Sequence, residues 1–438
     1  MDVGIKPPLP EAFLSRVGKQ LGEALPAFYA AMEGSPVRGI RMNPAKAGRM
    51  PFRDAQRKIP WARDGWELAS DSKAGSTIAH EAGQFYLQEP CAMLPGAVMD
   101  AKPGETILDL CAAPGGKSTQ MGLDMRGKGL LICNEPVPKR AAVLSRNLER
   151  MGIPHGIVTR ADPGKLAALW PEGFDGVLAD VPCSGEGMFR RNPETRNEWT
   201  EEKAAGCVRR QREILESAAR MVCPGGRLIY STCTWNPDEN EEQIETFLLG
   251  HPEFKPEGFR LPGIEAPEGM YTCWPHLVRG EGQFVARLRK RGSGSPRLED
   301  GSDAFALSKE CLRIWQTNGI GTERPNAAIG NMLTRIERIP VMKGIPVLRL
   351  GLCLGEVRGR IFIPDHAASM AITRPEMPEK ELTDSEALRF LAGEPIPGGE
   401  TGWVLMTWQG LVLGWGKGSE GTVKNHYPKG LRSEKLSV

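Results

Sequence analysis

The sequence predicts an α/β fold in which a largely parallel sheet is flanked by a small helical N-terminal extension and a β-rich C-terminal domain. Between residues 81 and 290, short β-branched or apolar segments alternate with amphipathic segments, the pattern of repeated βα units. The 438 residues correspond to about three domains of ordinary size. Apolar residues make up 40% of the chain, which is enough for several cores, and the 52 glycines and 36 prolines indicate many turns.

Residues 1–80 form the predicted N-terminal extension. Apolar side chains recur there at helical spacing, at Leu14, Val17, Leu21, Leu25 and Phe28. Between residues 38 and 63 the chain has eight lysines and arginines and a single acidic residue, Asp54. Because the net charge of the whole chain is only +2, we expect an anionic partner to bind at such a local cluster.

The central domain is predicted to span residues 81–290. Its predicted strands are 106–110, 130–134, 157–160, 176–179, 227–231 and 283–288, and its main helices are 138–151 and 203–222. In an open parallel sheet, ligands bind beyond the carboxyl ends of the strands. The residues that follow these strands are therefore the first candidates for a functional site.

The last third of the chain is predicted to be a β-rich domain, residues 306–438, joined by a Gly/Ser-rich linker, residues 291–305. Short strands are indicated at 346–354 and 360–363, and a hairpin at 402–408 and 411–415 around Gln409-Gly410. Five basic residues between positions 287 and 297 are either a second anion-binding patch or part of the linker. Residues 300–340 carry no pattern that predicts their structure.

The loop after the strand at 106–110 has the composition of a nucleoside-binding turn. Its residues are Cys111, Ala112, Ala113, Pro114, Gly115, Gly116 and Lys117. Small residues let a ligand approach the backbone closely, and the free N–H groups where the next helix begins attract anionic groups such as a carboxylate. Glu135 follows the next strand, 20 residues after Gly115, a spacing that suits hydrogen bonds to ribose hydroxyls.

Other interpretations of this loop stay open. A dinucleotide site would carry G-x-G-x-x-G, which is absent. A P-loop would need glycine where the chain has Cys111, although APGGKST otherwise fits a nucleotide hydrolase. A tight βα turn without any ligand is the remaining alternative.

Two cysteines follow neighbouring predicted strands. Asp180 and Cys183 come after the strand at 176–179, and Cys233 comes after the strand at 227–231. We expect both thiols and the carboxylate to face one cleft beside the nucleoside site. This set favours methylation at carbon 5 of a cytosine: a thiolate adds to carbon 6, Asp180 near N3 and N4 absorbs the developing charge, and a base later removes the carbon 5 proton.

The remaining cysteines and the hydropathy pattern point away from metals and membranes. The ten cysteines include no C-x-x-C pair, so no zinc or thioredoxin-type site is expected, and free thiols suit the cytoplasm. The longest uncharged stretch, residues 401–416, is only 16 residues long and contains four glycines. The N-terminus has no charged start and apolar core of a signal peptide, so we expect a cytoplasmic protein without a membrane partner.

Several motifs resemble those of a known family. LDLCAAPGGKSTQ, DVPCSGEGMFRRNP and YSTCTWNPDENEEQ are similar to the signatures of the Fmu/Sun/NSUN family of S-adenosylmethionine-dependent RNA (cytosine-5) methyltransferases. HEAGQFYLQEPCAMLP and GEGQFVARLRK extend the resemblance over about residues 7–290. The bacterial RsmF-like branch, which acts on 16S rRNA, is the most similar, and GLVLGWGKGSEGTVKNHYPKGLR resembles its PUA-like RNA-binding domain.

The resemblance implies a role for each strand-end residue. Cys233 would be the nucleophile, Cys183 the thiol that assists release, and Asp180 the residue that touches both methyl donor and cytosine. In DNA cytosine-5 methyltransferases the cysteine of the Pro-Cys motif attacks instead, so Cys183 is the alternative nucleophile. S-adenosylmethionine would lie over residues 111–117, with Glu135 at its ribose, Asp162 near its adenine and Asp180 near its methionine portion.

The resemblance also implies the architecture and the partners. The central domain would be a Rossmann-like methyltransferase domain, and the extension at residues 1–80 and the PUA-like domain would bind RNA. We expect a monomer that needs no metal and acts on 16S rRNA, free or in the assembled 30S subunit. A tRNA cytosine-5 methyltransferase and a non-catalytic RNA-binding assembly factor are the alternatives.

Two further groups of residues are candidates for RNA contact. In the tail, aromatic and basic side chains alternate at Trp415, Lys417, Lys424, His426, Tyr427 and Lys429, whereas Trp403 and Trp408 are expected in a barrel core. After Cys183, basic residues at Arg190, Arg191, Lys203, Arg209, Arg210 and Arg212 fit either RNA contact or an ordinary helix surface.

Overall fold

The central sheet has the parallel core that the sequence predicts. The computed structural model describes residues 6–46, 52–320, 323–372 and 377–438. The neighbouring strands β9-β8-β5-β6-β7 run parallel. In the same order their bounds are Val222–Thr232, Phe174–Asp180, Thr106–Asp109, Leu130–Asn134 and Gly156–Thr159. The corresponding strand predictions are confirmed, although β9 begins earlier than expected.

Antiparallel strands close both edges of this sheet. β14 (Gln283–Lys290) pairs with β9, and β10 (Phe254–Pro256) and β13 (Met270–Cys273) pair with β14. At the other edge, β17 (Val347–Leu350) pairs with β7. Since β17 lies within the predicted C-terminal domain, that part of the chain is anchored in the central sheet and is not merely tethered by the linker.

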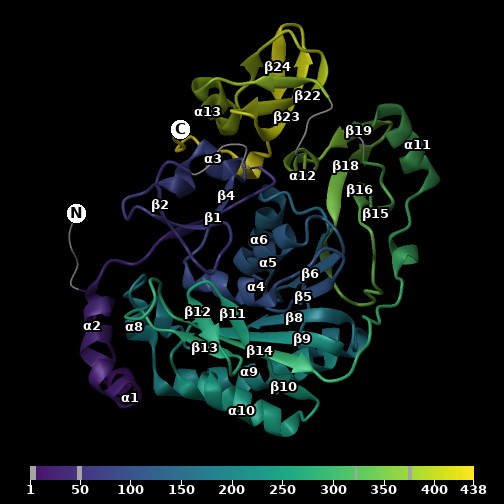
Figure 1. The fold of residues 1–438 in the computed structure, drawn as a ribbon. Helices are drawn as coiled ribbons and strands as arrows, with labels where there is room; N and C mark the ends of the chain where they lie inside the picture. The colour runs from purple at the N-terminus through teal and green to yellow at the C-terminus, as the bar shows by residue number, and fades with distance from the viewer. Residues whose placement is uncertain (1–5, 47–51, 321–322, 373–376) are drawn as a thin grey trace.

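Helices cover both faces of the sheet (Figure 1). One face packs against α4, α5 and α6, and the other against α7, α9 and α10. Their bounds are Leu94–Met99, Gly116–Asp124, Pro138–Arg150, Pro163–Leu169, Glu201–Met221 and Glu241–Gly250. Adjacent residues such as Ile107 and Leu108 belong to the two different cores, which explains why the strands read as continuous apolar runs rather than alternating ones.

The N-terminal extension is helical only in its first part. α1 (Glu11–Leu21) and α2 (Leu25–Glu33) are followed by an antiparallel sheet, β2-β3-β1-β4, that the sequence analysis did not predict. Its strands are Ala55–Lys58, Gly65–Leu68, Gly39–Met42 and Phe85–Leu87. These strands are too short to show a period of two, and β2 is largely exposed and polar. Part of the predicted basic stretch, residues 47–51, lies outside the described residues.

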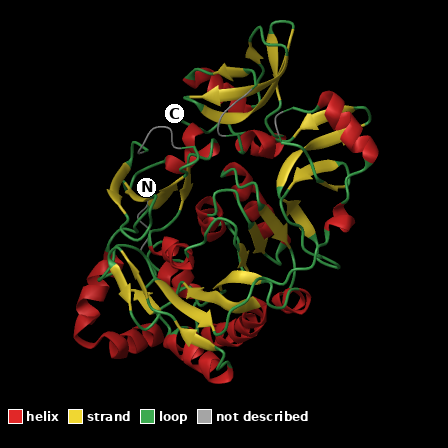
Figure 2. Ribbon diagram, turned by 45° about the vertical axis from the view of Figure 1, so that its right-hand side comes forward, coloured by secondary structure: helices red, strands yellow, loops and turns green. Residues whose placement is uncertain are grey.

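The C-terminal region contains two further sheets, which lie outside the central one in Figure 2. β15-β16-β18-β19 spans Ala327–Ile329, Met332–Arg335, Leu352–Arg358 and Ile361–Pro364, preceded by α11 (Lys309–Asn318). β20-β22-β23-β24-β21 spans Glu379–Glu381, Gly402–Trp408, Leu411–Ser419, Thr422–Asn425 and Ile396–Pro397, with α13 (Asp384–Ala392) beside it. The β22–β23 pair is the hairpin that the sequence predicts.

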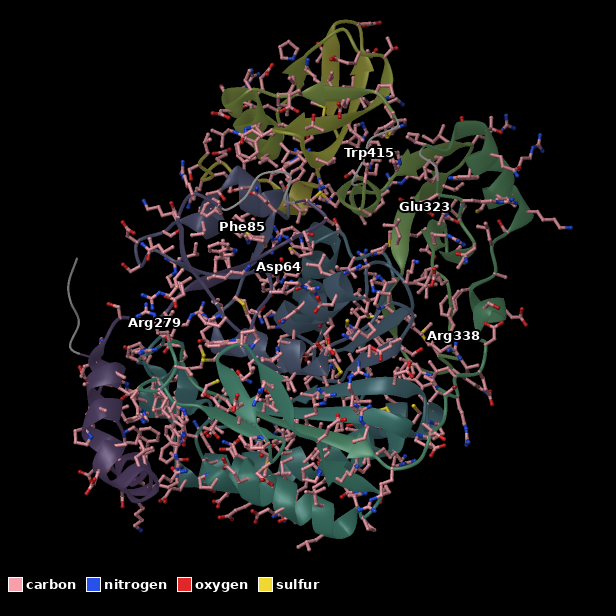
Figure 3. All side chains as sticks on the ribbon, in the orientation of Figure 1. Asp64, Phe85, Arg279, Glu323, Arg338 and Trp415 are labelled. Atoms are coloured by element: carbon pink, nitrogen blue, oxygen red, sulfur yellow. The ribbon has the colours of Figure 1, made fainter. Side chains whose placement is uncertain are left out.

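The two ends of the chain share one apolar core. Phe85 of the N-terminal sheet, labelled in Figure 3, belongs to the same buried cluster as Leu391 of α13. The backbone N–H of Ile78 donates a hydrogen bond to the carbonyl oxygen of Ser437, near the C-terminus. The Tyr427 hydroxyl donates to Glu81 at 3.2 Å. No helix in the described ranges has the length and apolar character needed to cross a membrane.

This shared core predicts that Leu391→Ala destabilises the protein. Leu391 is fully buried in α13, so truncation should lower the free energy of unfolding by about 2–5 kcal/mol, measured by urea denaturation. Leu249→Ala removes the same atoms from the exposed face of α10. This substitution should change the free energy of unfolding by no more than about 0.5 kcal/mol. Equal effects of the two substitutions would contradict the shared core.

Candidate active site

The loop between β5 and α5 forms one wall of a cleft at the carboxyl ends of the strands. Gly115, the residue before α5, has φ of 110°, a left-handed conformation that residues with side chains rarely adopt. Asp109, at the end of β5, lies buried beneath the loop, where its Oδ2 accepts a hydrogen bond from Ser118 Oγ at 2.6 Å. Its Oδ1 has no partner among the described residues. Burial raises the pKa of Asp109 to about 7.

Asn134, which was not among the predicted site residues, fixes the position of this loop. Its amide Nδ2 donates to the carbonyl oxygens of Leu110 at 3.2 Å and Ala161 at 2.9 Å. Its Oδ1 accepts from Thr159 Oγ1 and from the Ala161 backbone N–H. One buried side chain thus ties together the ends of β5, β6 and β7. A polar residue at the end of an otherwise apolar strand was the available signal.

The two strand-end cysteines lie in direct contact. Cys183 Sγ and Cys233 Sγ are 3.2 Å apart, and the Cys233 backbone N–H donates to Cys183 Sγ at 3.3 Å. Both cysteines are free thiols. The contact with Cys233, together with burial, raises the pKa of the Cys183 thiol well above its usual range. Cys183 is therefore a thiol, not a thiolate, at neutral pH.

Buried polar side chains hold the loops that carry these cysteines. Glu239 Oε2 accepts hydrogen bonds from the Ser184 backbone N–H at 2.9 Å and from Gln211 Nε2 at 2.8 Å. Asn240 Nδ2 donates to the Thr234 carbonyl oxygen at 3.0 Å. Both acceptor and donor come from the NPDEN run that follows Cys233. The loops after β8 and β9 are consequently cross-linked from inside the protein.

Asp180 lies between two donors at the same edge of the sheet. Lys117 Nζ forms an ion pair with Asp180 Oδ2 at 2.8 Å, and Gln283 Nε2 donates to Oδ1 at 3.4 Å. Burial acts to lower the pKa of Lys117, but the attraction of Asp180 outweighs it and the net shift is upward. Lys117 therefore stays protonated. Gln283, the first residue of β14, was not singled out from the sequence.

The cleft brings together most of the predicted site residues. Its lining includes Cys111, Ala112, Ala113, Pro114, Gly116, Lys117, Asp180 and Cys233. Cys183 lies directly behind Cys233 and lines a neighbouring groove. Glu135 is buried outside the cleft lining, where Oε1 accepts from the Val137 N–H and Oε2 pairs with Arg140. Asp162 caps α7 by accepting from the Gly164 N–H at 2.8 Å. The cofactor contacts of Glu135 and Asp162 stay predictions.

Three of the expected RNA contacts need correction, because their side chains are buried. Arg190 is buried and forms a two-pronged ion pair with Glu281, at 2.8 and 2.9 Å, so it supports the fold and is not a surface cation. Trp415, labelled in Figure 3, is also buried, whereas Trp403 is partly exposed and stacks near Lys417. Trp415 therefore belongs to the core of this sheet, and the side chain of Tyr427 is buried as well. Among the described residues, no cluster of histidine, cysteine and acidic side chains has the geometry of a metal site.

Family models match three parts of the chain. They are described as the N-terminal domain of 16S rRNA methyltransferase RsmF (residues 9–90), 16S rRNA methyltransferase RsmB/F (residues 96–289) and methyltransferase RsmF PUA domain (residues 378–433). Both cysteines and most of the cleft lining lie within the central match, and the lining residues Tyr86, Leu87, Gln88 and Glu89 lie within the N-terminal match.

Individual relatives agree with these models. Ribosomal RNA small subunit methyltransferase F of Escherichia coli is 33% identical over 466 residues, covering 96% of each chain. The protein of the same name from Cronobacter sakazakii is 31% identical, over 97% of this chain and 96% of its own. A crystal structure of a methyltransferase homolog protein from Pyrococcus horikoshii is 27% identical with a TM-score of 0.53, covering 64% of this chain and 100% of that one.

The buried Asp109 carboxyl predicts a pH-dependent stability. Its pKa in the folded state, about 7, exceeds the ordinary value of 3.8, so its contribution to stability declines as the pH rises from about 4 to 7. Asp109→Asn should therefore gain stability relative to the parent between pH 5 and pH 8, by more than about 1.4 kcal/mol, the equivalent of one pKa unit.

Urea denaturation at the two pH values, without methyl donor, measures this difference. Asp71→Asn, which removes an exposed carboxylate, is the matched control. If the stability difference between Asp109→Asn and the parent is the same at both pH values, the raised pKa of Asp109 is contradicted.

Proposed function

Because this chain belongs to the family of ribosomal RNA small subunit methyltransferase F, we propose that it methylates carbon 5 of a cytosine in 16S rRNA, with S-adenosylmethionine as the methyl donor. The observation that supports this chemistry most is the contact between the sulfur atoms of Cys183 and Cys233 beside Asp180. Carbon 5 of cytosine is too electron-poor to attack a methyl donor unless a nucleophile first adds to carbon 6.

The residues that line the cleft fit the proposed donor. S-adenosylmethionine supplies a methyl group on a positively charged sulfonium. The cleft offers carboxyl groups at Asp109 and Asp180, and Asp109 Oδ1 is a buried acceptor without a partner in the described part of the chain. Residues 111–116 have only small side chains, which allows close approach of a nucleoside to the backbone. A P-loop function is not favoured because the chain has Cys111 where that motif needs a glycine.

The positions of the two thiols support Cys233 as the nucleophile. Cys183 is not part of the cleft lining and lies behind Cys233. Cys233 lines the cleft together with Asp180 and Lys117. In the proposed reaction the Cys233 sulfur bonds to carbon 6, and the protonated Lys117 stabilises the negative charge that develops on the ring. Asp180, held by Lys117, accepts a hydrogen bond from the N4 amino group.

Release of the product is the proposed role of Cys183. After methyl transfer, a base removes the carbon 5 proton, and the bond between carbon 6 and the Cys233 sulfur breaks. The Cys183 S–H lies 3.2 Å from that sulfur and can donate a hydrogen bond to the leaving thiolate. The target base must leave its stack to reach the cleft, at a cost of a few kcal/mol that surrounding RNA contacts have to offset.

The proposed activity predicts that purified protein transfers a labelled methyl group from S-adenosylmethionine to 16S rRNA. Free transcript and 30S subunits from a strain that lacks the gene are offered separately, with tRNA as a third substrate, and nucleosides are identified by mass spectrometry. The expected product is 5-methylcytidine in ribosomal RNA. Stable RNA binding without any methyl transfer would favour a non-catalytic assembly factor, and label in tRNA alone would replace the substrate.

The roles of the two cysteines predict opposite phenotypes. Cys233→Ala should form no covalent protein–RNA adduct, whereas Cys183→Ala should accumulate one, and both should lower turnover by at least about 100-fold. Denaturing gel electrophoresis after incubation with donor and RNA shows the adduct. Cys223→Ala, which alters a buried cysteine at the start of β9, is the control and should behave as the parent. A swapped result would make Cys183 the nucleophile.

A further inference from the structure

A second groove begins at Cys183. It is lined by the loop after β8, by α8 (Thr195–Glu198) and by the first half of α9. Cys183 lines this groove, Cys233 lines the cleft, and Met188 lines both. Since the two sulfurs are only 3.2 Å apart, a polymer with one unit in the cleft has a short path into the groove.

The groove carries an excess of positive charge. Lys203, Arg209 and Arg210 line it, and all three are exposed. No ion pair joins Arg209 or Arg210 to a carboxylate in the described part of the chain. Lys203 Nζ donates to the backbone carbonyl oxygen of Glu198 at 2.6 Å, so its charge is not neutralised by that contact. The Glu198 side chain supplies the single carboxylate of the lining.

The glycine at position 206 indicates that this part of the groove is left open for a ligand. It is the only glycine in α9, and glycine is among the least favourable residues in a helix interior. Packing within the protein does not require it, because a Cβ at Gly206 would lie 3.9 Å from its nearest neighbour, Arg209. Gly185, which also lines the groove, has φ of 74°, so its backbone conformation accounts for the glycine, and no described atom lies within 4 Å of its Cβ position. Both glycines leave open space beside the cations.

We propose that this groove binds the nucleotides that flank the target cytosine, with Arg209 and Arg210 contacting their phosphates. The proposal rests on the proposed function, since it places the target base in the cleft at Cys233. A single-stranded segment suits the site because unpaired nucleotides can follow a narrow groove whose cations track the backbone. The groove then offsets part of the cost of unstacking the cytosine and contributes to the choice of target.

The test compares RNA binding by Arg209→Ala/Arg210→Ala with that of the parent protein. The probe is an unmodified 16S rRNA transcript, and dissociation constants are measured by filter binding at several salt concentrations. Each phosphate contact on a single strand contributes about 0.7 to the slope of log K against log salt, so losing two should reduce the slope by about 1.4. We expect at least a tenfold weaker affinity, with an unchanged Kd for S-adenosylmethionine.

Controls on the same helix separate a groove from a general charge effect. Arg220→Ala removes an exposed arginine ten residues beyond Arg210, about 15 Å along α9, and should leave affinity and slope unchanged. Gly206→Glu, which places a carboxylate in the groove, should weaken RNA binding as the double variant does. If the double variant and Arg220→Ala bind RNA alike, the groove proposal is overturned.

The binding readout also keeps this proposal separate from the proposed function. If the parent protein transfers no methyl group to carbon 5 of cytosine, the proposed function fails, whereas the comparison of affinities still decides the groove. If methylation occurs and the double variant keeps parental affinity and KM for RNA, the groove fails alone.

Discussion

The direct contact between the Cys183 and Cys233 sulfurs is the constraint on which the proposed chemistry of this site depends. It follows from the parallel pairing of β8 with β9, which brings both loops to one edge of the sheet. Strand pairing alone would not fix two loops to within a hydrogen-bond distance. Glu239 and Asn240 do so, because their buried side chains satisfy backbone groups in both loops and leave little freedom to either cysteine.

The contact between the two sulfurs also lies at the boundary between the cleft and the groove. Cys233 faces the cleft that contains Asp180, Lys117 and the small-residue loop, and Cys183 faces the cationic groove along α9. A base in the cleft and its neighbours in the groove would meet at the two thiols. In this arrangement the cleft would hold the reacting base, and the adjoining groove would select the flanking RNA.

The sequence predicts well which residues gather at the candidate active site, because the carboxyl ends of parallel strands lie at the same edge of a sheet. Asp180, Cys183, Cys233 and the loop at residues 111–117 could be grouped on that basis. Interactions between distant segments could not be foreseen. The burial of Arg190 depends on Glu281, which lies 91 residues away in the chain. The N-terminal sheet, the pairing of β17 with β7 and the core shared by both chain ends likewise depend on long-range packing, which the local sequence pattern does not encode.

The most direct test of the central claim is the site of covalent attachment on RNA that contains 5-fluorocytidine. The carbon–fluorine bond blocks the final elimination, so the parent protein should retain the RNA after methyl transfer. Digestion and mass spectrometry then locate the modified peptide. The account predicts a methylated fluorocytidine attached to Cys233. Attachment to Cys183, or turnover of unmodified RNA to 5-methylcytidine with no adduct on the fluorinated RNA, would contradict it.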